Sequence, residues 1–188
     1  AAGDVNGDGY GDLLIGAPGR DANGVDAGAT YLLFGAADGF GSTFALSSID
    51  GLNGLRFDGR LTDGSKKEFS GSALSAAGDV NGDGYSDVLV GASNYTNGQQ
   101  NEGGVFVYNG AAAGLSLEPN MTAESDQAFS EFGGSVTNGG DFNGDGLTDM
   151  FIGAPMYDNG QNNEGRVYVY AGKYNGVSTI ANWSVENA

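Results

Sequence analysis

A nine-residue motif occurs three times in this chain, and its regular surroundings constrain the fold more than any other feature. Each copy has Asp at positions 1, 5 and 9, Asn at position 3, and Gly at positions 4 and 6. The copies stand at residues 4–12, 79–87 and 141–149. A glycine follows the first Asp after 31 positions in every copy, at Gly35, Gly110 and Gly172. One structural unit is therefore repeated three times, and length varies only in the connectors 36–78 and 111–140.

The motif places oxygen-bearing side chains at the spacing of a calcium-binding loop. Ca²⁺ takes about 6 to 8 oxygen ligands from carboxylates, amides, backbone carbonyls and water. The side chains at positions 1, 3, 5 and 9 and the carbonyl at position 7 are the predicted ligands. They are Asp4, Asn6, Asp8, Tyr10 and Asp12; Asp79, Asn81, Asp83, Tyr85 and Asp87; and Asp141, Asn143, Asp145, Leu147 and Asp149. The sequence therefore predicts three Ca²⁺ sites, one in each repeat.

The segment after each loop distinguishes it from an EF-hand, which ends in Glu at position 12 and continues into a helix. Here each loop continues into a short apolar run, such as Leu13–Pro18 or Met150–Pro155, that is typical of a buried strand. Asp, Asn and Gly also form ordinary solvated turns, which is the alternative interpretation. Three copies in register favour a metal-binding loop over an ordinary turn.

Each repeat has room for about four short strands, and no segment shows a helical period. The loop is followed by one strand, and a second begins near Gly28, Gly103 or Gly165. Further candidates are 55–57, 69–75, 121–123 and 132–137. Four-stranded units repeated at this period predict an all-β fold of antiparallel β-propeller blades.

The phrases Phe132-Gly-Gly-Ser-Val and Ile152-Gly-Ala-Pro155, on either side of a loop, resemble the FG-GAP repeat of integrin α-subunit propellers and of bacterial surface proteins. The resemblance covers essentially the whole chain and implies one calcium ion in each loop, between two strands of a blade. Two departures leave the ligands intact. Ser93 replaces the usual Pro in the second copy, and the first copy lacks its Phe-Gly strand.

We expect a single repeat domain over residues 1–188, with blade 1 at 1–68, blade 2 at 69–131 and blade 3 at 132–188. Blade 1 lacks its first strand. A propeller closes with about 4 to 8 blades, so three are too few for a ring. The expectation is either a piece of a longer chain or a subunit whose open blade edges pair with another copy.

Charge and composition exclude several functions. The formal net charge is −17, which makes nucleic acid an unsuitable partner. His and Cys are both absent, so neither a Ser-His-Asp triad nor a thiol nucleophile is available. The sequence shows no membrane span. Because calcium loops of weak affinity fill at extracellular calcium levels, an extracellular or cell-surface location is expected.

Three functions remain open. We favour a non-catalytic calcium-binding propeller segment that recognises a protein or glycan. The alternatives are a self-assembling subunit of a surface fibre or ring, and a non-catalytic part of a polysaccharide- or lipid-degrading enzyme. Residues 95–102 and 157–164 combine a tyrosine with amides and a carboxylate, which suits a sugar but also an ordinary polar turn. The tyrosines and phenylalanines of the strands are expected to pack between blades.

Overall fold

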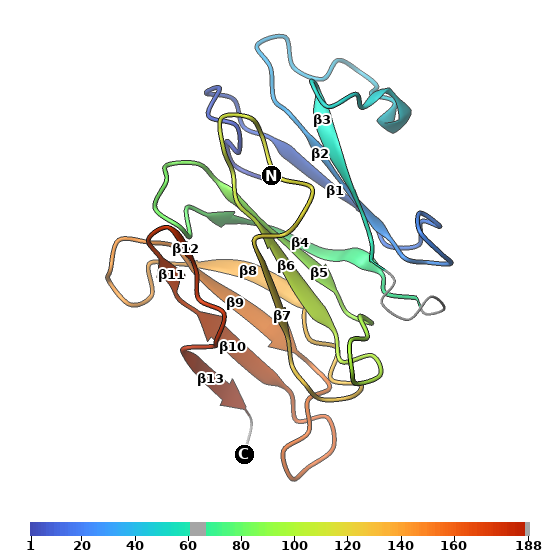
Figure 1. Cartoon of the computed structure of the whole chain (residues 1–188), viewed down its shortest axis with the longest axis vertical. Helices are drawn as coiled ribbons and strands as arrows, with labels where there is room; N and C mark the ends of the chain where they lie inside the picture. Colours follow the sequence, from blue (N-terminus) through green and yellow to red (C-terminus); the bar gives the residue numbers. More distant parts are fainter. Residues whose placement is uncertain (61–66, 187–188) are drawn as a thin grey trace.

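The computed structural model describes residues 1–60 and 67–186. Three antiparallel sheets lie side by side in chain order, and the described residues contain one helix, the short 3₁₀ turn η1 at Leu46–Ser48. Figure 1 shows the sheets as successive layers from the first repeat to the third. The predicted all-β fold of blade-like sheets is confirmed.

The first sheet has three strands and the other two have four. The first contains β1 (Leu13–Ala17), β2 (Ala29–Leu33) and β3 (Gly54–Asp58), in that order. The second contains β4 (Ser70–Gly78), β5 (Asp87–Ala92), β6 (Gly104–Tyr108) and β7 (Met121–Glu124). The third contains β8 (Ser135–Gly140), β9 (Asp149–Ala154), β10 (Arg166–Tyr170) and β13 (Trp183–Glu186). A small hairpin, β11 (Gly172–Lys173) with β12 (Gly176–Val177), precedes β13.

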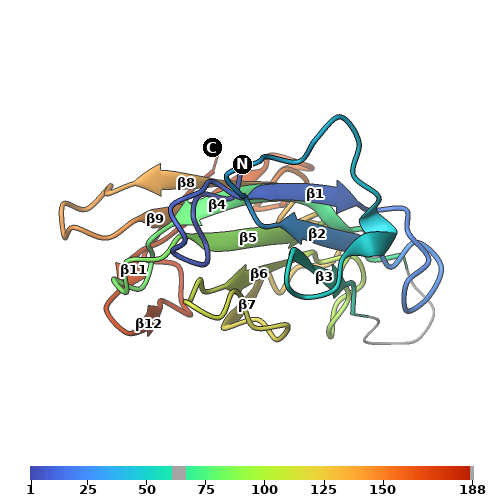
Figure 2. The same cartoon turned by 90° about the horizontal axis from the view of Figure 1, so that it is seen from above.

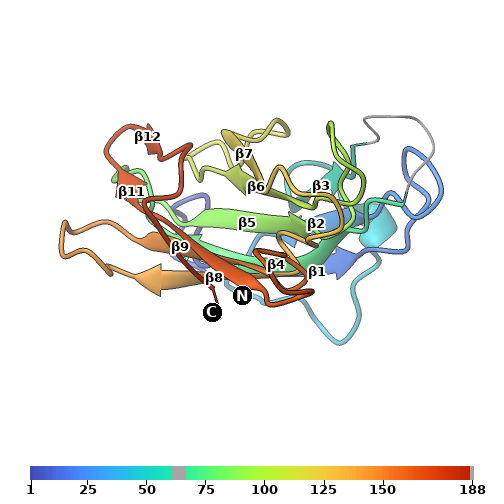
Figure 3. The same ribbon diagram turned by 90° about the horizontal axis from the view of Figure 1, so that it is seen from below.

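Equivalent strands of successive sheets face one another. β1, β4 and β8 lie along one side of the molecule, and the later strands of each sheet lie toward the other side (Figure 2). The view from below shows β12, β7 and β3 together at that opposite side (Figure 3). This is the arrangement of neighbouring propeller blades, because each sheet buries one face against the next.

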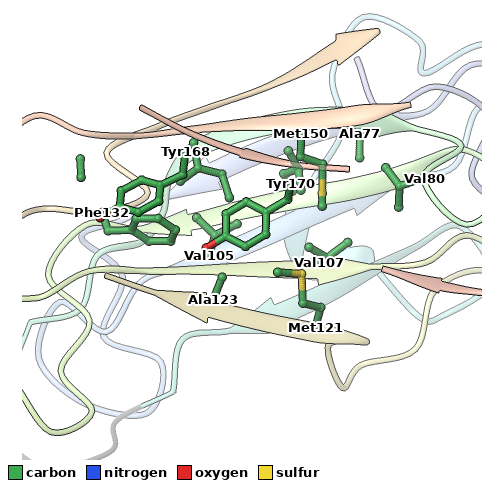
Figure 4. Packing of buried hydrophobic residues seen from close by; sticks show 13 residues of the cluster. Ala77, Val80, Val105, Val107, Met121, Ala123, Phe132, Met150, Tyr168 and Tyr170 are labelled. Atoms are coloured by element: carbon green, nitrogen blue, oxygen red, sulfur yellow. The ribbon is translucent and has the colours of Figure 1, made fainter. Parts of the chain in front are cut away.

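Two hydrophobic cores fill the spaces between the sheets. The core between the second and third sheets contains Phe132, Tyr168 and Tyr170 together with aliphatic side chains of β5, β6 and β7 (Figure 4). Phe132 and Tyr168 meet edge to face, with ring centroids 5.1 Å apart. Phe57 and Tyr108 meet in the other core, at 4.6 Å. The predicted packing of aromatic residues between blades is confirmed in both cores.

Sequence reasoning aligns Phe69 with Phe132, and the structure shifts this correspondence by one residue. Ser70 pairs with Gly28 in a parallel bridge, just as Phe132 pairs with Gly103. Ser70 is therefore the equivalent of Phe132, and Phe69 has a positive φ of 52° at the turn before the strand. The two residues share a backbone position, since Ser70 N donates to Ala27 O and Phe132 N donates to Glu102 O, both at 3.1 Å.

Candidate metal centres

The three predicted calcium loops occupy the same place in the three sheets. Two of them connect the first and second strands of their sheet, β4 to β5 and β8 to β9, and the first precedes β1 after a bridge between Gly3 and Asp12. They lie along one side of the molecule (Figure 1). The loops that repeat in the sequence therefore also occupy equivalent positions in the three sheets.

The first Asp of each loop organises the backbone. In the first loop, Asp4 Oδ1 accepts hydrogen bonds from the N–H groups of Gly7 at 2.7 Å and Asp8 at 3.1 Å, and Oδ2 accepts one from Gly9 at 2.9 Å. Asp79 and Asp141 make the same three bonds in their loops. The chain is thereby wrapped around this carboxylate.

The residues at positions 3, 5 and 7 are connected to one another in the same way in all three copies. In the second loop Asn81 Nδ2 donates to Asp83 Oδ2 at 2.8 Å, and Tyr85 N donates to Asp83 Oδ1 at 3.0 Å. The equivalent pairs are Asn6 with Asp8, Tyr10 with Asp8, Asn143 with Asp145, and Leu147 with Asp145. Asp8, Asp83 and Asp145 are exposed, so their carboxylates remain accessible to an ion.

The Asp at position 9 is buried and joins the loop to a glycine just beyond the end of β2, β6 or β10. Asp87 Oδ2 accepts from Val80 N and Oδ1 accepts from Gly110 N, both at 2.8 Å. Asp12 and Asp149 bond in the same way, with Gly35 and Gly172 as the distant donors. These glycines are the residues found 31 positions after the first Asp. The fixed interval in the sequence thus has a physical cause that the sequence alone does not reveal.

Electrostatics couple the carboxylates within a loop. Burial raises the pKa of Asp12, two backbone N–H groups oppose the shift, and the charges of Asp8 and Asp4 raise the pKa further. Burial likewise raises the pKa of Asp87 to about 7, with Asp83 and Asp79 acting in the same direction. Burial and neighbouring carboxylates thus disfavour the charged form of Asp12 and of Asp87, and a bound cation would favour it.

The predicted donors of each loop are all oxygen atoms. Within residues 1–60 and 67–186, no three His, Cys, Asp or Glu side chains converge closely enough to hold a metal by themselves. The predicted set in each loop adds an asparagine and a backbone carbonyl to three carboxylates, and every donor is oxygen. Oxygen-only donors of this kind fit Ca²⁺ and do not fit metals that prefer nitrogen or sulfur.

Successive loops also contact one another, which the sequence does not predict. Ser86 N of the second loop donates to Asp4 O at 3.0 Å, and Thr148 N of the third donates to Asp79 O at 3.1 Å. Lys173 N donates to Val80 O at 2.8 Å. Each of the first two loops is therefore bonded to the following sheet.

The second candidate site, the polar loops at 95–102 and 157–164, has the character of a turn. Glu102 is fully buried, and its Oε1 accepts from the backbone N–H groups of Asn97 and Gln99. Tyr95 is 6 % exposed and packs edge to face on Phe106. In residues 95–102, the tyrosine and carboxylate that suggest a sugar are thus buried inside the protein.

In the third sheet, Tyr157 of the equivalent loop contacts Arg166 of β10. Arg166 stacks over the ring of Tyr157 at 4.2 Å, and its Nε donates to Glu186 Oε2 at 2.9 Å. The ion pair joins β10 to β13.

The fold and the repeated loop define a protein built from β-propeller blades. The FG-GAP repeat model matches residues 1–33, 70–108 and 132–170, which is more than half of the chain. The chain belongs to the FG-GAP repeat family.

Its relatives include proteins of two kinds. Integrin alpha-5 of Xenopus laevis is 32% identical over 180 residues, a match that covers 91% of this chain and 16% of the integrin. Integrin alpha-PS2 of Drosophila melanogaster is 34% identical over 169 residues, covering 84% of this chain and 11% of the integrin. Phosphatidylinositol-glycan-specific phospholipase D of Mus musculus is 33% identical over 171 residues, covering 89% and 19%. The chain spans about a fifth or less of the length of each of these three relatives.

The described part of the chain contains no helix with the length and apolar character needed to cross a membrane.

Proposed function

We propose that this chain is a non-catalytic, calcium-binding segment of an extracellular β-propeller that recognises a protein or glycan ligand. Its blades comprise residues 1–68, 69–131 and 132–188. The observation that carries the proposal is the threefold recurrence of one hydrogen-bonded loop with the same oxygen donors. Ordinary solvated turns have no reason to repeat a buried Asp, an exposed Asp and an Asn at fixed spacing.

The residues that would hold Ca²⁺ are those at positions 1, 3, 5, 7 and 9 of the loops. When bound, the ion would neutralise carboxylates that otherwise repel one another. Three divalent ions would reduce the formal net charge from −17 to about −11. Because loops 4–12 and 79–87 bond to the following sheet, their occupancy would stabilise the packing of blades as well as the loop itself.

The relatives support recognition as the role of the segment and also support a second candidate. Integrin subunits are relatives, which favours an adhesion or recognition propeller. The phospholipase D relative favours a non-catalytic part of a lipid-degrading enzyme. The two differ in the activity expected of a longer protein that contains this segment. Hydrolysis of a glycosylphosphatidylinositol substrate by such a protein would support the second candidate.

The calcium assignment is tested by Asp83→Ala, with Asp38→Ala as the matched control. Asp83 is an exposed loop carboxylate, and Asp38 is an exposed carboxylate outside the three loops. Isothermal titration should give one calcium ion fewer for Asp83→Ala, while Asp38→Ala should match the native chain. In calcium at about 100 times the dissociation constant, loss of one site should cost about 2.7 kcal/mol of unfolding free energy. Unchanged stoichiometry in Asp83→Ala would remove that loop from the proposal.

A further inference from the structure

The chain contains ten Asn-Gly pairs, and an asparagine followed by glycine is especially prone to lose its side-chain amide. The reaction begins when the glycine nitrogen gives up its proton and attacks the side-chain carbon Cγ of the asparagine. Glycine favours this step because it has no side chain to obstruct the approach. Whether a pair reacts in the folded protein therefore depends on how firmly the glycine N–H group is held.

Seven of the ten glycines are restrained by the fold. Four of them donate their N–H group to an aspartate side chain at 2.6 to 2.8 Å, namely Gly7, Gly82, Gly110 and Gly144. The other three lie in strands β3, β8 and β12, namely Gly54, Gly139 and Gly176. An N–H group bonded to a carboxylate loses its proton less readily. An extended strand has the wrong backbone geometry for the five-membered ring that the attack forms.

The remaining three pairs lie in equivalent loops, which connect β1 to β2, β5 to β6 and β9 to β10. They are Asn23-Gly24, Asn97-Gly98 and Asn159-Gly160. These loops leave the strands at the end opposite to the calcium loops (Figure 1). All three asparagines are exposed, and in the described part of the chain the N–H groups of the three glycines make no hydrogen bond. No contact therefore holds these glycine nitrogens back from the reaction.

Each of these asparagines also attaches its loop to the last strand of its sheet. Asn97 Nδ2 donates to Glu124 Oε1 at 3.0 Å, where β7 ends. Asn159 Nδ2 donates to Glu186 Oε1 at 2.5 Å, where β13 ends. Asn23 Nδ2 donates to a backbone carbonyl just after β3, at 2.9 Å. The nitrogen that attaches the loop is thus the atom that deamidation removes.

We propose that Asn23, Asn97 and Asn159 are sites of spontaneous deamidation, and that the reaction detaches each loop from the last strand of its sheet. The glycine nitrogen forms a bond to Cγ. The bond between Cγ and Nδ2 breaks, and the amide nitrogen leaves as ammonia with the proton from the glycine N–H group. Water then opens the cyclic imide at either carbonyl and gives aspartate or isoaspartate. Water is the only co-reactant, and neither calcium nor a partner takes part.

The second sheet should be affected most by this change. Asn97 lies between two glutamates, since its Nδ2 donates to Glu124 and its backbone N donates to Glu102 Oε1 at 2.7 Å. Glu102 is fully buried, and among the described residues Oε2 of Glu102 and Oε2 of Glu124 have no hydrogen-bond partner. A carboxylate at position 97 would therefore add a third negative charge beside two glutamates and remove a donor from one of them.

The third sheet offers a built-in comparison, because its glutamate is already paired. Arg166 Nε donates to Glu186 Oε2 at 2.9 Å. A carboxylate at position 159 would meet this ion pair rather than an unpaired glutamate, and the guanidinium would offset part of the added charge.

Rates of deamidation in the folded and the unfolded chain test the assignment. The whole chain is incubated in mildly alkaline buffer, once in millimolar calcium and once in urea, and each pair is followed by peptide mapping with mass spectrometry. Relative to its own rate in urea, each of the seven restrained pairs should react at least about tenfold more slowly when folded, because a hydrogen bond or a strand must open first. The pairs at Asn23, Asn97 and Asn159 should slow by less than about threefold.

Substitutions that imitate the aspartate product test its effect on the fold. Asn97→Asp should lower the melting temperature by at least about 2 °C, and Asn159→Asp should lower it by less. Asn162→Asp is the matched control, since it makes the same change of charge at an exposed asparagine of the third sheet's loop. Its melting temperature should equal that of the native chain.

Two results would overturn the proposal. The three loop pairs could slow on folding as much as the pairs in the calcium loops, which would mean that the fold restrains their glycine nitrogens too. Alternatively, Asn97→Asp could melt at the same temperature as Asn162→Asp, which would mean that the amide of Asn97 does not attach the loop.

Discussion

The second and third sheets have the same strand pattern, and they differ in what covers their equivalent faces. In the second sheet, Met121 is 4% exposed and Val80 is fully buried, because the third sheet covers both. Their equivalents in the third sheet are Trp183, which is 51% exposed, and Phe142, which is 59% exposed. Burial in this fold is therefore decided by the neighbouring sheet rather than by the sheet that carries the residue.

The same comparison applies to the loops. The carbonyls of Asp4 and Asp79 accept bonds from the following sheet, whereas Asp141 begins the loop of the last sheet described. Phe142 instead packs on Phe151 and Trp183 of its own sheet, at centroid distances of 5.5 and 6.3 Å. The same loop sequence thus bonds to the following sheet in the first two repeats, whereas in the third repeat Phe142 of the loop packs on its own sheet.

The largest effect is expected at the buried end of a loop. Asp87→Ala would leave the N–H groups of Val80 and Gly110 buried without their acceptor. Each such group costs about 1 to 3 kcal/mol, so we expect a loss of about 2 to 6 kcal/mol in unfolding free energy. Urea denaturation, in calcium and again in chelator, measures it. If the loss in chelator were below about 1 kcal/mol, the buried carboxylate would have no structural role apart from the metal.

A smaller loss of unfolding free energy should distinguish the equivalent positions Met121 and Trp183. Met121→Ala should lower the unfolding free energy by about 2 to 5 kcal/mol, since it opens a cavity in the core between the second and third sheets. Trp183→Ala should cost less than about 1 kcal/mol, because its side chain is half exposed. Thermal unfolding of both variants compares them directly. Equal losses would mean that a neighbour covers Trp183 as thoroughly as the third sheet covers Met121.

The smallest change in unfolding free energy is expected at two equivalent glycines, Gly91 and Gly153. Gly91→Ala forces a methyl group against the backbone carbonyl of Gly133 and should lower the unfolding free energy by about 1 to 3 kcal/mol. Gly153→Ala meets only the hydroxyl of Ser135, which can rotate away, so a change within about 0.5 kcal/mol is expected. Chemical denaturation of the two variants provides the measurement. A large loss for Gly153→Ala would show that the third sheet has a close neighbour in solution.

Much of the fold can be predicted from the sequence, because its strands are marked by loops and glycines at fixed intervals. The sequence predicts β1, β5 and β9 immediately after the calcium loops, and the structure confirms them. Strand β13 is not among the predicted strands, although Asn182 before it accepts a bond from Ala171 N just as Asn120 before β7 accepts one from Asn109 N. The calcium ligands themselves stay a prediction.

The backbone contacts between repeats are the part of the fold that the sequence does not predict. The equivalence of Ser70 with Phe132 depends on bridges to Gly28 and Gly103 that are distant in the chain. The bonds from Ser86 and Thr148 to the preceding loop are made by backbone N–H groups, so no residue type marks them. The sequence therefore predicts the aromatic packing between repeats but not the backbone hydrogen bonds that join them.

Counting the calcium ions bound to the native chain tests the central claim most directly. Native mass spectrometry with calcium and after chelation, together with the melting temperature in both states, would provide the count and its effect on stability. We predict three ions for each chain and a lower melting temperature once they are removed. A chain that binds no calcium and melts at the same temperature in chelator would contradict the account.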